Sequence, residues 1–344
     1  MNSDQKSRKL PPGIRADYET VYAVGTHGPI NEDAIVSILH TELNPQFQGS
    51  LAAIEQSWSY IRQDTVSKDF LKAYAAFREV TQIYPLSAEN WHSGERIPIS
   101  HAKEVATDAL VLAFQAHYKS AYKSLREIFE LIVLQAYFYK EKDKSIIGKW
   151  GRGEERTSLL KIMLKQLGQD SLYQAGDKKL NVSNRISKIY DDLGAYVHTR
   201  GVPTVTMGLT GSNILVFTPD ALDRFLTLFT SVAHLCVMFL AIFFPAAIIH
   251  VPAFAKFGHL DPVWLPRKDK VDSIRSILSK KELKALDDLA SQNAWFQQLV
   301  VKINALPDLS KAEVDETYER LEAASRQGPE QLIRILKEAN KVLE

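Results

Sequence analysis

The sequence of 344 residues contains only one cysteine, Cys236. A single thiol excludes an intrachain disulfide and a cysteine-based zinc cluster. Residues 1–15 have no apolar run of the kind that a signal peptide requires, so we expect a protein of a reducing, cytoplasmic compartment. The formal net charge is only +1, from 42 Lys and Arg against 41 Asp and Glu. This balance argues against a dedicated nucleic-acid-binding protein, whose surface needs a strong positive field.

The familiar catalytic signatures are also missing. The sequence has no Walker A pattern, no G-x-G-x-x-G, no H-E-x-x-H, no G-x-S-x-G and no EF-hand loop. Four of its histidines, at positions 92, 101, 117 and 198, are not spaced like metal ligands. We therefore expect no metal and no cofactor.

Charge is absent from one long segment. Between Phe225 and Ala255 there is no Lys, Arg, Asp or Glu, and residues 225–244 alone are long enough to cross a bilayer. One interpretation is a single membrane span through 225–249, which would place the protein in the inner membrane. The other is the buried central helix of an α-helical domain, with Cys236 as a small buried hydrophobe. His234 near the middle and the lack of Trp or Tyr favour the buried helix.

The rest of the pattern is helical. Apolar residues recur at helical spacing, for example Phe70, Tyr74 and Phe77 on one face. The fold class is mainly α, a multi-helix bundle with helical N- and C-terminal extensions and one small β-hairpin near 203–217. We divide the chain into a flexible arm (1–28), an N-terminal helical region (29–99), a central bundle (100–258) and a C-terminal helical region (267–344).

Several helix boundaries can be predicted from local signals. Residues 100–140 contain no Pro or Gly, and a break near 114–120 would divide this long stretch. Pro219 after Thr218 marks the start of the uncharged helix. Capping boxes at Ser279–Glu282 and Ser310–Glu313 begin two later helices. Glycine-containing segments, 141–157 and the stretch that includes Gly168 and Gly176, are predicted to be loops.

One set of polar residues is predicted to meet across two helices. Arg126 and Glu130 stand at i and i+4 on an otherwise apolar helix, where they can form a partly buried ion pair. Tyr190 and His198 lie on a later helix, with His198 near its end. Arg126, Glu130, Tyr190 and His198 are therefore either an acid–base or phosphate-binding cluster or a polar network that fixes the register of the helices.

These same segments carry a resemblance. SLREIFELIVLQAYFY, then a segment with Trp150, then IYDDLGAYVHTRG resemble bacterial all-α HEPN-like and abortive-infection domains over residues 105–250. This resemblance implies a metal-independent RNase of phage defence, whose active site places an Arg four to six residues before a His. Arg185 precedes His198 by thirteen positions, so the motif is not met. Of the two active-site residues that the resemblance implies, only the histidine has a counterpart here, His198. Arg126 would have to supply the cation from another helix.

A basic segment spans residues 140–165. Trp150 is positioned to stack on a base while Lys149, Arg152 and Arg156 contact phosphates, so this segment is a candidate RNA or DNA interface. The alternative is a solvated loop beside a core tryptophan.

The preferred interpretation is a non-catalytic or regulatory helical interaction protein of bacterial type. The resemblance implies a role in defence against phage or mobile elements. Its partner would be another protein or a second copy of the chain. The alternatives are a divergent metal-independent RNase that uses His198 and Arg126, and a single-span membrane protein.

Overall fold

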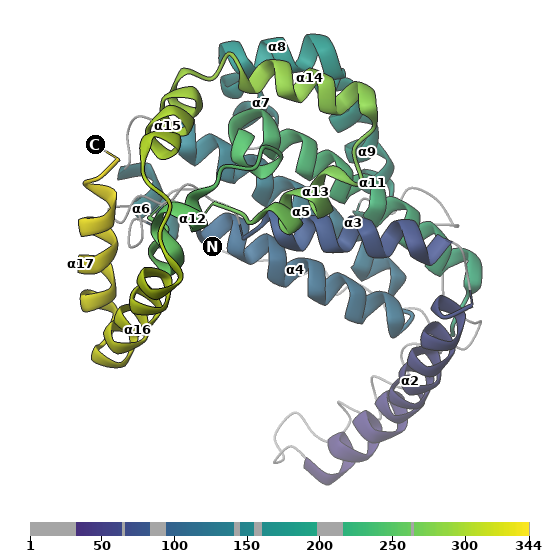
Figure 1. The fold of residues 1–344 in the computed structure, drawn as a ribbon. Coiled ribbons are helices and arrows are strands. Elements are labelled where there is room, and N and C mark those ends of the chain that lie inside the picture. Colours follow the sequence, from purple (N-terminus) through teal and green to yellow (C-terminus); the bar gives the residue numbers. More distant parts are fainter. Residues whose placement is uncertain are drawn as a thin grey trace, which may run out of the picture.

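The computed structural model describes residues 32–63, 66–82, 94–140, 145–154, 160–197, 216–262 and 265–343. All regular structure in these ranges is helical, which confirms the mainly α fold class (Figure 1). The predicted arm at 1–28 lies outside the described residues. The β-hairpin predicted near 203–217 also falls outside them, except for its last two residues.

The helices follow one another with short connections. They are α2 (Glu32–Ile61), α3 (Val66–Val80), α4 (Ile97–Phe114), α5 (Tyr118–Lys140), α6 (Ser145–Gly151), α7 (Leu160–Leu167), α8 (Ser171–Leu180), α9 (Val182–Val197), α11 (Pro219–Phe243), α12 (Ala253–Phe257), α13 (Lys268–Arg275), α14 (Lys280–Ala290), α15 (Ala294–Ala305), α16 (Lys311–Gln327) and α17 (Pro329–Asn340). Two 3-10 turns, η2 (Pro245–Ala247) and η3 (Gly258–Leu260), flank α12.

Helix α11, which carries no charged residue from Phe225 to its end, lies at the centre of the main hydrophobic core. It contacts α3, α5, α8, α9 and α14, and its four phenylalanines at 225, 229, 239 and 243 are all buried. Within the described residues, α11 is the one helix long and apolar enough to cross a membrane, and 72% of that apolar window is buried inside the protein. A helix that is apolar on most of its circumference can be accommodated by such a core.

The apolar face predicted for residues 70–77 packs on this central helix. Phe70 and Phe77 are almost completely buried, and the rings of Phe70, Tyr74 and Phe77 all lie within 6.3 Å of the Phe229 ring. Several of these contacts are edge-on, the arrangement that aromatic pairs prefer. The sequence prediction of one apolar face on α3 is confirmed, and this face places α3 along α11.

Local helix signals are also confirmed. The long stretch from Ser100 breaks between α4 and α5, where Ala116 adopts a positive φ of 62°. Pro219 opens α11. Both predicted capping boxes form, with reciprocal hydrogen bonds between Ser279 and Glu282 and between Ser310 and Glu313.

Two loop predictions are wrong. Residues 145–151 form α6, which buries Ile147 against the core. Residues 171–180 form α8, which Asp170 caps by accepting hydrogen bonds from the Leu172 and Tyr173 backbone N–H groups. Gly176 lies inside α8, next to α11. A side chain does not fit at this position, because an added Cβ would come within 2.8 Å of Ile242 on α11. The glycine therefore permits close helix packing and does not mark a turn.

The helical extensions lie at the two ends of the described chain (Figure 1). Helix α2 projects away from the body (Figure 1). Among the residues of α2 whose burial the structure describes, the buried ones, Ala53 and Ser57, lie in the C-terminal third of the helix. At the other end, α15 forms a second, smaller apolar cluster around Phe296, and α16 packs on α17 and η3.

The close approach of α8 and α11 can be tested with a matched pair of glycines. We expect Gly176→Ala to destabilise the protein by about 1–3 kcal/mol, because its methyl group overpacks against Ile242. Gly194→Ala in α9, where no atom lies within 4 Å of an added Cβ, should instead stabilise by about 0.5–1 kcal/mol. Urea unfolding measures both, and equal effects would contradict the assigned packing.

Candidate functional site

A cavity of about 710 Å³ opens between α3, α9, α11 and the turn after α13. Its volume falls within the range of small-molecule sites in proteins. Its walls are Asp69, Lys72 and Ala73 from α3, Arg185, Lys188, Ile189 and Asp192 from α9, Thr227, Leu228, Thr230, Ser231, His234 and Leu235 from α11, and Ser276 with Ile277.

The wall contributed by α11 is a polar stripe on an otherwise apolar helix. Thr227, Thr230, Ser231 and His234 stand at i, i+3, i+4 and i+7, which places them on one helical face. All four line the cavity. They are also the only Ser, Thr or His residues between positions 225 and 244. The apolar helix therefore presents its polar groups to the cavity and its phenylalanines to the core.

The hydroxyl groups of this stripe are oriented by the helix itself. Thr230 donates to the Leu226 carbonyl at 2.8 Å, and Ser231 donates to the Thr227 carbonyl at 3.0 Å. Each hydroxyl oxygen keeps lone pairs with which it can accept a hydrogen bond from a ligand.

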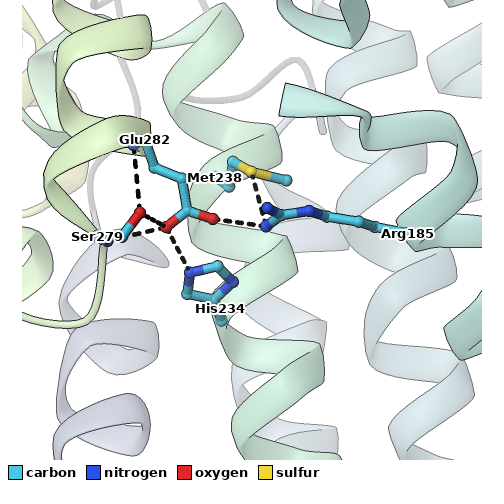
Figure 2. Close-up of polar contacts among 5 residues, drawn as sticks. All are labelled: Arg185, His234, Met238, Ser279 and Glu282. Carbon is cyan, nitrogen blue, oxygen red and sulfur yellow. Dashed lines mark hydrogen bonds and ion pairs between the residues drawn. The ribbon is translucent and has the colours of Figure 1, made fainter. Parts of the chain in front are cut away.

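Behind the cavity wall, one carboxylate ties three helices together (Figure 2). Glu282 on α14 accepts a hydrogen bond from Arg185 of α9 at 2.6 Å and pairs with His234 Nε2 of α11 at 3.2 Å. It also accepts from the backbone N–H and the hydroxyl of Ser279, both at 2.8 Å. Arg185 in addition contacts the Met238 sulfur at 3.6 Å. Glu282 therefore fixes the positions of Arg185 and His234 in the cavity wall.

This carboxylate is held in its charged form. Burial alone would raise the pKa of Glu282, whose side chain is only 8% exposed. The hydrogen bonds from the Ser279 backbone, from Arg185 and from the Ser279 hydroxyl, together with His234, outweigh that effect and lower the pKa from 4.5 to about 2. Glu282 is consequently an anchor for neighbouring donors and is poorly suited to accept a proton at neutral pH.

The outer rim of the cavity carries charges of both signs. Asp69, Lys72, Lys188 and Asp192 are all exposed. None of the four forms an ion pair with another residue in the described ranges. Two acidic and two basic groups are thus available at the mouth of the cavity.

Comparisons of the chain with protein-family models, with curated proteins and with solved structures gave no match. The HEPN-like resemblance stays a prediction. The site is therefore interpreted from its own geometry.

The structure brings together three of the four residues predicted to form a polar cluster. Arg126 pairs with Glu130 at 2.9 Å and donates to the Tyr190 hydroxyl, which in turn donates to Glu130 at 3.1 Å. The guanidinium also lies 4.1 Å from the centre of the Tyr190 ring. Burial and the charge of Glu130 raise the pKa of Tyr190. His198, the fourth member, lies outside the described residues, so a catalytic role for this set stays a prediction.

Two residues of the predicted basic interface, Trp150 and Arg152, make internal contacts. Trp150 is partly buried and packs edge-on against Phe138, with ring centres 5.4 Å apart. Arg152 makes two hydrogen bonds to Glu154, at 2.7 and 2.8 Å. Lys149 lies in α6, and Arg156 falls outside the described residues. Nucleic-acid binding at 140–165 also stays a prediction.

The cavity itself was not predicted, although the sequence carries part of its signal. The spacing of Thr227, Thr230, Ser231 and His234 within an uncharged segment already defines a polar face. The capping box identified Glu282 but not its partners, because Arg185 and His234 lie 97 and 48 residues away. No local pattern indicates contacts of that separation.

We expect Glu282→Gln to lower stability at neutral pH, because the neutral amide loses the charge-assisted bonds to Arg185 and His234. The pKa of Glu282 is depressed, so its contribution is complete above 4.5 and is lost as the pH falls towards 2. The difference between variant and wild type should therefore shrink on acidification. Urea unfolding at a series of pH values measures it.

Glu313→Gln is the matched control, because Glu313 occupies the same capping-box position in α16 but is exposed, and among the described residues its side chain hydrogen-bonds to Ser310 alone. Glutamine can also serve at this position of a capping box. A loss for Glu313→Gln as large as that for Glu282→Gln would show that the three-helix network adds nothing beyond the cap.

Proposed function

We propose that this protein is a non-catalytic, regulatory helical protein that binds a small amphoteric molecule in the α3–α9–α11 cavity. The observation that carries the proposal is the polar stripe of α11. The central apolar helix presents hydroxyl groups and a histidine to the cavity. Polar groups at such positions can orient a bound polar ligand. The resemblance supports a role in bacterial defence against mobile elements, and the expected partner, another protein or a second copy, stays a prediction.

The chemistry of the walls favours a ligand that carries both an amino group and an acidic group. Thr230 and Ser231 offer hydroxyl oxygens that accept hydrogen bonds. Lys72 and Lys188 can pair with an acidic group, while Asp69 and Asp192 can pair with an amino group. Arg185 is already neutralised by Glu282, so it shapes the wall more than it attracts an anion.

Three features support a binding role over a catalytic one. Within the described residues, no hydroxyl or thiol contacts the His234 ring, so a nucleophile–base pair is lacking. Glu282 has a depressed pKa and several donors of its own. Among those same residues, no cluster of three His, Cys, Asp or Glu side chains forms a metal-binding group.

The ligand hypothesis can be tested with the twenty standard amino acids as probes. A ligand that binds only the folded state raises the unfolding temperature, and the rise grows with the logarithm of the ligand concentration above the dissociation constant. We expect at least one amino acid to do so in thermal unfolding of the full chain. Thr230→Val, which removes a lining hydroxyl at nearly constant shape, and Lys188→Ala should each weaken this binding by about tenfold.

The control is Lys178→Ala, because Lys178 is an exposed helical lysine of α8 that does not line the cavity. The Lys178→Ala variant should bind the amino acid with the same affinity as the wild type. The proposal fails if no amino acid shifts the unfolding temperature, or if Lys178→Ala weakens binding as much as Lys188→Ala.

We further propose that the protein is cytoplasmic, in place of the inner-membrane alternative. Burial of most of the apolar window of α11 supports this, because a span must expose its apolar surface to lipid. Alkaline carbonate extraction of cells that express the full chain should release the protein into the soluble fraction. Retention in the membrane pellet would instead favour a span through 225–249.

A further inference from the structure

A second hollow lies at the other end of α3, away from the cavity just described. A cavity of about 560 Å³ is lined by residues of α3, α4, α12, η3 and α13 and of their connections, and a smaller one of about 230 Å³ adjoins it. The two share Gln82, Arg96 and Lys103 as lining residues. Together they form one groove that follows the start of α4, which we call the α4 groove.

The charge of the α4 groove is positive. Its larger part is lined by four basic residues, Arg96, Lys103, Arg267 and Lys270, and by two acidic ones, Glu79 and Asp261. The smaller part adds one further acidic residue, Glu104. Lys270 is paired with Glu79 at 2.7 Å, and Arg267 lies 3.5 Å from Asp269. Arg96 and Lys103, in contrast, form no ion pair with any residue that the structure describes. These two cations lie where the two parts of the groove meet.

Arg96 has an unsatisfied donor. Its Nε atom is buried and has no hydrogen-bond partner among the described residues. Burial also lowers the pKa of Arg96, because desolvation disfavours the charged guanidinium. An unpaired, partly desolvated guanidinium costs free energy that a bound anion would offset. A phosphate or carboxylate in the groove would bind the terminal N–H groups of the guanidinium, whose planar fork suits two parallel hydrogen bonds.

Aromatic rings line the same cavity. Phe254 is 42% exposed and lies edge-on to His259, with ring centres 5.2 Å apart. His259 is exposed as well and contacts Tyr318, which does not itself line the groove, at 4.9 Å. An exposed aromatic ring close to cations is the arrangement that binds a planar base by stacking.

We propose that the α4 groove binds a nucleoside phosphate, with the phosphate on Arg96 and Lys103 and the base on Phe254 and His259. The exposed aromatic rings favour a nucleotide over a sugar phosphate or free phosphate, which offer no planar group. Three acidic residues in the lining and a chain net charge of only +1 disfavour a long nucleic acid, which needs an extended basic surface.

The experiment is calorimetric titration of the full chain with adenosine diphosphate, adenosine and inorganic phosphate. The diphosphate should bind, and each of the two fragments should bind at least about tenfold more weakly, because each satisfies only one part of the groove. Lys103→Ala and Phe254→Ala should each reduce the affinity for the diphosphate by about tenfold. Thermal unfolding confirms that each variant is folded.

The matched controls are Trp295→Ala and Lys311→Ala. Trp295 has the same exposed fraction as Phe254, 42%, and Lys311 is an exposed lysine of α16. Neither lines the α4 groove. Both variants should bind the diphosphate like the wild type, and so should Lys188→Ala, which affects only the other cavity.

Four outcomes would overturn the proposal. The first is no heat of binding with adenosine diphosphate, and the second is binding that Lys103→Ala and Phe254→Ala leave unchanged. In the third, inorganic phosphate binds as tightly as the diphosphate, which would reduce the groove to a simple anion site. In the fourth, a single-stranded RNA binds more tightly than the diphosphate and loses affinity in the same variants, which would make nucleic acid the occupant.

Discussion

Burial of α11 is the constraint on which the rest of this structure depends. From Phe225 to Phe243 this helix carries no charge, so this part must be covered on most of its circumference, and each buried phenylalanine contributes about 1.5–3 kcal/mol by leaving water. Helices α3, α5, α8, α9 and α14 supply that cover. Their positions follow from it: α3 lies where its three aromatic rings meet Phe229, and α8 approaches closely where Gly176 meets Ile242. The core is thus organised around one helix.

The same constraint produces the cavity. One narrow face of α11 is polar and lies uncovered between α3 and α9, so the wall of the cavity is the part of the central helix that the core does not use. The buried carboxylate of Glu282 on α14 binds two residues of this wall. Burying an ion pair gives little net stability, since desolvation offsets much of the attraction. Its consequence here is geometric: Arg185 and His234 are held by partners on a third helix.

The features that could be predicted from the sequence are those that local spacing determines. The start of α11 at Pro219, the break before α5, both capping boxes and the pairing of Arg126 with Glu130 all depend on residues within a few positions of one another. The error at α8 and the missed role of Glu282 have the same cause. Gly176 is present because of Ile242, and Glu282 acquires its site role from α9 and α11. Such contacts become visible only when distant segments are packed together.

Helix α3 connects the two proposed binding sites. Lys72 of α3 lines the cavity and Glu79 of the same helix lines the α4 groove, and seven residues of helix separate them by about 10 Å. Helix α13 runs beside α3, reaching from Lys270 at the groove to Ser276 at the cavity, and the Lys270–Glu79 ion pair joins the two helices. Phe70 and Phe77 both hold α3 against Phe229 of α11. The two proposed sites therefore share one helix, and the same apolar contact with the core sets the position of both.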